Sequence, residues 1–236
     1  MSHTPSHAAQ NFSPLYFLGS LGAGGLTVTF FMYLMFWVPH PGRTVPVFED
    51  IAAAFASGNP LTQGMIAVAM AGIAFFAVLN LKALAWNLSH YAAFMKTEGY
   101  KALRSSNAES QILALPLALA MSVNVGFILG LVFVPGLWGI VEYLFPLAMI
   151  AFLAIGWLAF RMIGAFLGRV LTSGGGFSHK ANNSYAQLLP AFALAMIGVG
   201  LAAPAAMSTS ATVAGLSIIA SSFFMVAAVI YGIVAL

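Results

Sequence analysis

Long apolar runs, separated by short polar stretches, occupy most of this chain. Six runs approach or exceed the length with which a helix crosses the hydrocarbon core of a bilayer, about 20 residues. They cover residues 14–38, 61–81, 112–134, 143–170, 188–207 and 213–236. Apolar and polar residues do not alternate along them, as they do in the strands of a membrane barrel. The pattern predicts an all-α integral membrane protein with six transmembrane helices in one transmembrane domain, residues 1–236.

The composition agrees with this prediction and narrows the class of protein. Hydrophobic residues make up 61% of the chain and charged residues only 6%, whereas a soluble domain carries about 25% charged residues. So few charges cannot cover a water-facing surface, and we expect the lipid bilayer to surround the chain. Cysteine is absent, which excludes disulfides and thiolate metal sites. The net charge of +3 rests on few residues and indicates no nucleic-acid partner.

The basic residues predict the orientation, because loops rich in lysine and arginine stay on the cytoplasmic side. The loops after the second and fourth runs hold most of them, namely Lys96, Lys101, Arg104, Arg169 and Lys180. The loops on the other side hold only Arg43. We therefore expect a multi-pass protein of a bacterial-type inner (plasma) membrane, with its N-terminus in the cytoplasm.

The first, third and fifth runs share a spacing of proline and small residues. They read "PLYFLGSLGAG" from residue 14, "PLALAMSVNVG" from residue 116 and "PAFALAMIGVG" from residue 190, each with a glycine ten residues after the proline. Ten helical residues cover about 15 Å, half the hydrocarbon thickness. The pattern predicts three hairpins as parallel pseudo-repeats, with helices 1, 3 and 5 inner and helices 2, 4 and 6 outer. Pro116 and Pro190 are the expected kinks, and coincidence is the alternative, because proline and glycine are common here.

Three stretches resemble the tellurite-resistance/dicarboxylate transporter (TDT) superfamily, which includes the plant slow-type anion channels. They are "SPLYFLGSLGAGGLTVTFFMYLMFWVPHPG" in the first run, "LNLKALAWNLSHYAAF" leaving the second and "GGGFSHKANNSYAQLLPAFALAM" leading into the fifth. The last is similar to the family's glycine-rich turn and proline-bearing fifth helix. Within the superfamily the chain resembles the TsoY-like membrane proteins, and the resemblance covers most of the chain.

The resemblance implies ten helices, arranged as five hairpins about a central axis, with proline-kinked odd helices around a pore. The six runs correspond to the first six of these ten helices. Helices seven and nine have no counterpart here, nor does the family's phenylalanine gate in helix nine, so we assign no gate residue. We expect that the chain continues beyond Leu236, that another chain completes the ring, or that the architecture differs.

The repeat and the resemblance together predict a membrane channel or transporter for small anions or organic acids. The pore-lining candidates are small or polar residues of the odd helices, namely Gly22, Gly24, Ser122, Asn124, Gly126, Gly198 and Gly200. The glycines have a second explanation, since small residues let helices pack closely, and the Asn124 amide has one in a bond to a neighbouring helix. The alternative function is a non-catalytic accessory or structural subunit of a larger membrane complex. The expected protein partners are copies of the chain in a homo-oligomer, or other membrane subunits.

The sequence gives little support to catalysis or cofactor binding. The stretch "GSLGAGG" lacks the Lys-Ser/Thr pair that follows a phosphate-binding loop. The membrane runs contain no acid–base dyad, nucleophile triad or carboxylate cluster. Imidazoles that hold a haem face each other inside a bundle. None of the five histidines falls at the predicted midplane; they are His3, His7, His40, His90 and His179. We therefore expect no enzymatic activity, no metal and no cofactor.

Overall fold

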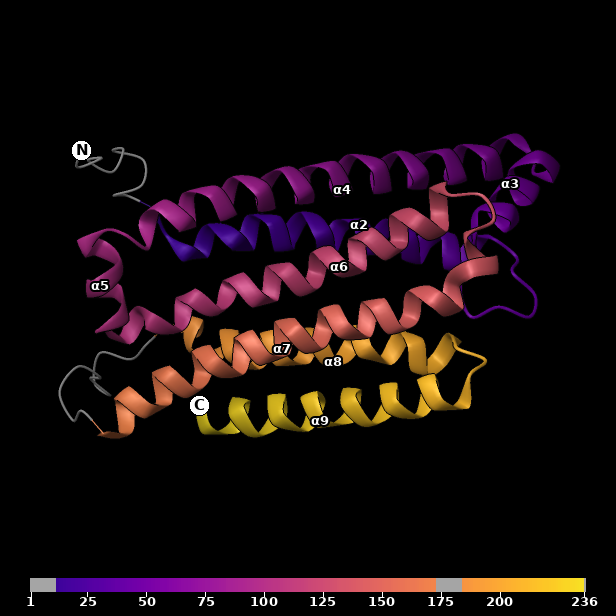
Figure 1. Ribbon diagram of the computed structural model, residues 1–236. Helices are drawn as coiled ribbons and strands as arrows, with labels where there is room; N and C mark the ends of the chain where they lie inside the picture. Colours follow the sequence, from indigo (N-terminus) through magenta and orange to yellow (C-terminus); the bar gives the residue numbers. More distant parts are fainter. Residues whose placement is uncertain (1–11, 173–183, 236) are drawn as a thin grey trace.

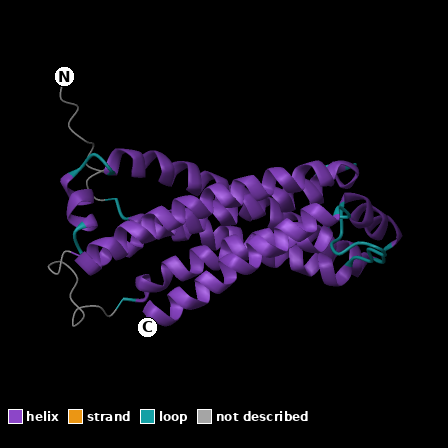
Figure 2. Cartoon of the chain, turned by 60° about the horizontal axis from the view of Figure 1, so that its bottom comes forward, coloured by secondary structure: helices purple, strands orange, loops and turns teal. Residues whose placement is uncertain are grey.

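The protein is a bundle of long helices that run side by side along one axis (Figure 1; Figure 2). The computed structural model describes residues 12–172 and 184–235, which form helices and connecting loops without any strand. Six helices of this part are long and apolar enough to cross a membrane, which confirms the predicted all-α membrane fold. The α-helices are α2 (Phe17–Trp37), α3 (Phe48–Ser57), α4 (Pro60–Phe94), α5 (Glu98–Arg104), α6 (Ala114–Phe133), α7 (Val141–Thr172), α8 (Leu189–Met207) and α9 (Ala211–Ala235).

The helices α2, α6 and α8 begin in the same way. A short 3-10 turn precedes each of them, and the turns are η1 (Pro14–Tyr16), η2 (Asn107–Leu113) and η5 (Tyr185–Leu188). A serine stands before each turn, and its hydroxyl accepts a hydrogen bond from the backbone N–H two residues later; these serines are Ser13, Ser106 and Ser184. Serine favours this position because it satisfies a backbone donor that the helix leaves free.

The second membrane helix is longer than the apolar run that predicted it. The run ended at residue 81, whereas α4 continues as a helix to Phe94. Its 35 residues extend over about 52 Å, well beyond a hydrocarbon core of about 30 Å. Hydropathy marks where the chain leaves the lipid, not where the helix ends. The last turns of α4 bury Tyr91 and Phe94 against the core.

The packing places α6 in the middle of the bundle. It contacts α2, α4, α7 and α8, while α2 packs along α4 and α8 packs along α9. The helices α6 and α8 are the most buried of the six membrane helices, and α2 is no more buried than α4 or α7. One buried apolar cluster includes Phe17, Leu113 and Leu194, and a second includes Leu34 and Ile66.

Charged residues divide the bundle into two halves of opposite sign. In Figure 1, α5 and the end of α7 lie at one end of the bundle and α3 at the other. We call the first the basic half, and its described charged residues are Lys82, Lys96, Lys101, Arg104, Arg161, Arg169, Glu98 and Glu109. The acidic half holds Arg43, Glu49, Asp50 and Glu142. The cytoplasmic side was predicted from the basic residues in the loops of the basic half. Lys180 was one of them, and it lies outside the described residues.

Candidate functional site

A groove lies where α2, α6 and α8 face one another, with a volume of about 520 Å³. Its walls are apolar and rich in methionine, with Met32 and Met35 on α2, Met121 on α6, and Met196 and Met207 on α8. We call it the methionine groove. Methionine has a flexible, polarisable side chain that adapts to guests of different shape. The groove is therefore a hollow that belongs to the three odd membrane helices together.

Asn124 provides the side-chain amide of this groove. Its Nδ2 lies 3.6 Å from the Met196 Sδ, to which it donates a hydrogen bond across from α6 to α8. A thioether sulfur is a weak acceptor, so this donor is poorly satisfied by its protein partner. Asn124 stands nine residues before Phe133, the end of α6 in the acidic half, and thus about 14 Å from it. The groove therefore holds, near the middle of α6, an N–H donor that can exchange its weak sulfur acceptor for a stronger one.

Gly24 and Ser122 lie at a different place, the junction of α2, α4 and α6. A Cβ added to Gly24 would meet the Met121 side chain and would lie 2.9 Å from the Asn80 Nδ2. The Ser122 hydroxyl donates to the Asn80 Oδ1 at 3.0 Å and to the carbonyl of Ala118 on its own helix at 3.0 Å. Both candidates contribute to close contact between helices in this structure.

The remaining glycine candidates face other helices or open space. Gly126 lines a cavity of about 270 Å³ between α6 and α7. Gly198 abuts Met225 of α9, Gly200 abuts Phe152 of α7, and nothing lies within 4 Å of a Cβ added to Gly22. Of the seven predicted pore-lining residues, the methionine groove brings in Asn124 but not the others.

The two expected kink prolines stand in the first turns of their helices. Pro116 is the third residue of α6 and Pro190 the second of α8. In a first turn, proline removes no hydrogen bond, because the N–H there has no partner within the helix. Each of the two prolines thus stands just after the point where a 3-10 turn changes to an α-helix, not in the interior of the helix.

Two features of this region were not predicted from the sequence. Asn80 is completely buried and bonds to Ser20 and Ser122. The sequence does carry a signal that could have indicated it: an asparagine inside the apolar run "FFAVLNL". A buried amide in a bilayer needs hydrogen-bond partners. The methionines of the groove gave no such signal, since methionine is common throughout the apolar runs.

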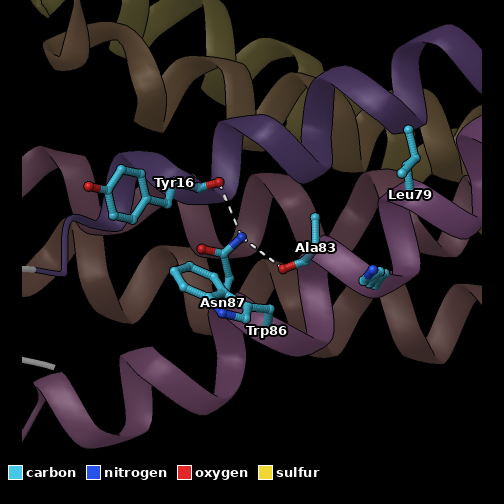
Figure 3. A pocket seen from close by; sticks show the side chains of 6 residues that line it. Tyr16, Leu79, Ala83, Trp86 and Asn87 are labelled. Carbon is cyan, nitrogen blue, oxygen red and sulfur yellow. Dashed lines mark hydrogen bonds between the residues drawn. The ribbon is translucent and has the colours of Figure 1, made fainter. Parts of the chain in front are cut away.

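A second hollow, of about 460 Å³, lies between the start of α2 and α4 (Figure 3). There the Asn87 Nδ2 donates to the carbonyl oxygens of Tyr16, at 3.1 Å, and Ala83, at 2.8 Å. These two acceptors fix the orientation of the amide, whose Oδ1 has no partner among the described residues. Leu79, Trp86 and the exposed Lys82 complete the lining. The contact fastens the beginning of α2 to α4.

The described residues hold no group of three or more His, Asp or Glu side chains that would bind a metal ion. His90 stacks on Trp86 with ring centroids 3.9 Å apart, and the His40 Nδ1 lies 2.6 Å from the carbonyl of Val38. His3, His7 and His179 lie outside the described residues.

No family model matches the chain, and no curated protein or solved structure matches it. The resemblance to the TDT superfamily therefore stands on the sequence stretches alone and stays a prediction.

Proposed function

We propose that this protein is a membrane channel or transporter for small anions or organic acids, and that the methionine groove is part of the path. The observation that carries the proposal is the Asn124 amide, which donates to a weak sulfur acceptor within a hollow shared by α2, α6 and α8. An anion accepts hydrogen bonds more strongly than a thioether does. A carboxylate in the groove would thus accept the Asn124 hydrogen bond in place of the Met196 Sδ.

The lining favours an organic acid over a small inorganic anion. Apolar side chains such as Phe31, Met32 and Leu131 make up most of the walls. They suit the hydrocarbon part of a monocarboxylate or dicarboxylate, while the amide suits its charged end. Selectivity then depends on width, on apolar constriction and on the amide dipole.

The proposed arrangement has three hairpins, formed by α2 with α4, α6 with α7, and α8 with α9, around an axis along the membrane normal. The inner helices are α2, α6 and α8, and the N-terminus is cytoplasmic. The serine-capped 3-10 turns before these three helices support a repeat, because the same local structure recurs at the same point. The shared groove supports a common inner face.

A second candidate function is an accessory or structural subunit of a larger membrane complex. The observation that favours it is the open arrangement of α2 and α8, which pack on α6 but not extensively on each other. An open arc leaves one side of the groove to be closed by another chain. A homo-oligomer or a different membrane subunit would supply that side.

Flux of organic acids into proteoliposomes tests the transport proposal. The intact protein is expected to carry radiolabelled succinate down a gradient into the vesicles, above the uptake of vesicles without protein. Asn124→Leu should lower the flux at least several-fold, because it removes the donor. Thr29→Ala is the matched control, since the Thr29 hydroxyl bonds to Gly25 on its own helix and is exposed.

Absence of flux under several gradients would count against transport, and full flux through Asn124→Leu would count against the methionine groove as its path. Purification in mild detergent distinguishes the second candidate. Stoichiometric recovery of other membrane subunits together with an absence of flux would favour the accessory role.

A further inference from the structure

A cavity of about 670 Å³ opens in the basic half, between α4, α5 and α7. Its lining includes Arg104 on α5, Arg161 on α7, Tyr91 on α4 and Tyr100 on α5. Leu115 of α6 also contributes. We call it the arginine cavity. It is separate from the methionine groove and plays no part in the proposed path.

The charge of the arginine cavity is positive and incompletely paired. The Arg161 guanidinium lies over the Trp157 ring, 4.9 Å from its centroid, and no carboxylate of the described residues forms an ion pair with it. Arg104 pairs with Glu109 at 3.0 Å, but Glu109 also pairs with Arg169 at 2.6 Å. One carboxylate thus serves two arginines, and Arg161 adds a further positive charge. An arginine of a membrane helix that has no carboxylate partner is a candidate anion-binding residue.

The depth of Arg161 corresponds to a membrane boundary. It lies 20 residues after the start of α7, about 30 Å along the helix. Lys82 lies 22 residues after the start of α4, about 33 Å along it. Both distances match the hydrocarbon thickness of about 30 Å. Arg161 therefore stands at the level where lipid headgroups begin, and Tyr91 and Met95 extend the cavity beyond it.

The walls of the arginine cavity suit a lipid as well as its phosphate. Leu88 on α4 and Leu158, Met162 and Ala165 on α7 form an apolar lining beside the arginines. The helices α4 and α7 do not pack extensively on each other, so direct contact between these two helices does not close the cavity. A phospholipid would place its glycerol and first acyl carbons along these residues.

We propose that the arginine cavity binds the headgroup of an anionic phospholipid, with the phosphate between Arg104 and Arg161. The planar guanidinium matches two phosphate oxygens at once. Basic hollows between membrane helices on the cytoplasmic side are typical sites for such headgroups. The apolar walls make the membrane lipid, not free phosphate, the ligand.

Native mass spectrometry of the intact chain in detergent, with phosphatidylglycerol added, tests this site. Arg161→Gln is expected to weaken binding about tenfold, the loss that follows from removing one charge-assisted hydrogen-bond donor. Arg161→Lys should retain part of the affinity, because it keeps the charge but loses the bidentate geometry. The same melting temperature for both variants and the parent protein establishes that they are folded.

Lys82→Gln is the matched control, because it removes one positive charge at the same depth from the other hollow, that of Figure 3. It should leave the binding of phosphatidylglycerol unchanged. Equal weakening by Lys82→Gln and Arg161→Gln would overturn the proposal in favour of general surface charge. Equal binding of phosphatidylcholine, or displacement of the lipid by inorganic phosphate, would also overturn it.

Discussion

Asn80 of α4 and Ser20 of α2 are joined by reciprocal hydrogen bonds in the interior of the bundle. The Asn80 Nδ2 donates to the Ser20 carbonyl at 2.8 Å, and the Ser20 hydroxyl donates to the Asn80 carbonyl at 3.0 Å. The Ser122 hydroxyl of α6 donates to the Asn80 Oδ1 at 3.0 Å. Both Asn80 and Ser20 are completely buried. One amide therefore joins three membrane helices, and protein partners satisfy its polar atoms in a buried position.

Replacement of Asn80 by leucine should destabilise the protein. The change removes the bonds that the Asn80 side chain makes to Ser20 and Ser122 across the helix contacts. The Ser20 hydroxyl keeps its bond to the backbone carbonyl of residue 80, and the Ser122 hydroxyl keeps its bond to the carbonyl of Ala118. Bonds between membrane helices are worth about 0.6 kcal/mol on average, so we expect a loss of about 1–3 kcal/mol in the free energy of unfolding. Unfolding in mixed detergent and SDS measures it.

Asn124→Leu is the comparison for this prediction, because among the described residues the Asn124 amide bonds only weakly, to the Met196 Sδ at 3.6 Å. Its stability should change by less than half as much as that of Asn80→Leu. Equal losses for the two variants would show that the bonds of Asn80 do not hold the helices together.

Two glycines of the first membrane helix should respond to alanine in opposite ways. A Cβ at Gly24 would collide with the Met121 side chain and lie 2.9 Å from the Asn80 Nδ2. We expect Gly24→Ala to cost about 1–3 kcal/mol through overpacking. Gly22 has nothing within 4 Å of an added Cβ, so Gly22→Ala should be neutral or about 1 kcal/mol more stable through helix propensity.

Melting temperatures of the two glycine variants in the same detergent provide the measurement. A lower value for Gly24→Ala together with an equal or higher value for Gly22→Ala is the expected pair. If both melting temperatures fell by the same amount, the close approach of the helices at Gly24 would not explain the loss of stability.

The sequence predicted the class of fold and the number of membrane helices, because apolar length alone determines what crosses a bilayer. It did not predict that α4 extends to Phe94, since the turns after Lys82 are polar enough to leave the lipid and still pack on the core. The spacing of Gly24, Gly126 and Gly200 was visible in the sequence. Which neighbour each glycine faces depends on how its helix is rotated. The helices α2, α6 and α8 carry apolar residues on all sides, so the pattern leaves their rotation undetermined.

The candidate site was predictable only in part. Asn124 was apparent as a polar residue at the centre of an apolar run, and it lies in the methionine groove. Its partner Met196 was not, because the facing of α6 and α8 is a property of the packed bundle. Nor did the sequence reveal that Arg104 and Arg161, far apart in the chain, line one cavity. Convergence of distant residues requires tertiary structure.

The stability that Gly200→Ala loses should be restored by a second substitution, at Phe152. A Cβ at Gly200 would meet the Phe152 ring, with the Cε2 atom 2.7 Å away. Gly200→Ala should therefore destabilise the packing of α8 on α7. Phe152→Leu removes the ring and should restore stability in the double variant, with a coupling of about 1–2 kcal/mol. Unfolding free energies of the two single variants and the double variant give the coupling, and simple additivity would contradict the contact.

Glu109 should be the acidic residue whose loss costs the most stability. Its side chain is 1% exposed and pairs with Arg169 at 2.6 Å and with Arg104 at 3.0 Å, which joins α5, η2 and α7. Glu109→Gln would leave two arginines with no carboxylate between them. We expect a loss of about 2–3 kcal/mol, less than for a fully buried pair because the arginine side chains are partly exposed.

Glu98→Gln is the matched control, since Glu98 pairs with Lys101 at 2.7 Å but its side chain is 86% exposed. Water and salt screen such a pair, so its removal should leave the melting temperature unchanged. High salt should not abolish the effect of Glu109→Gln, because screening acts weakly on a buried group. A salt-sensitive loss, or one no larger than that of Glu98→Gln, would mean that Glu109 does not fix the ends of these helices.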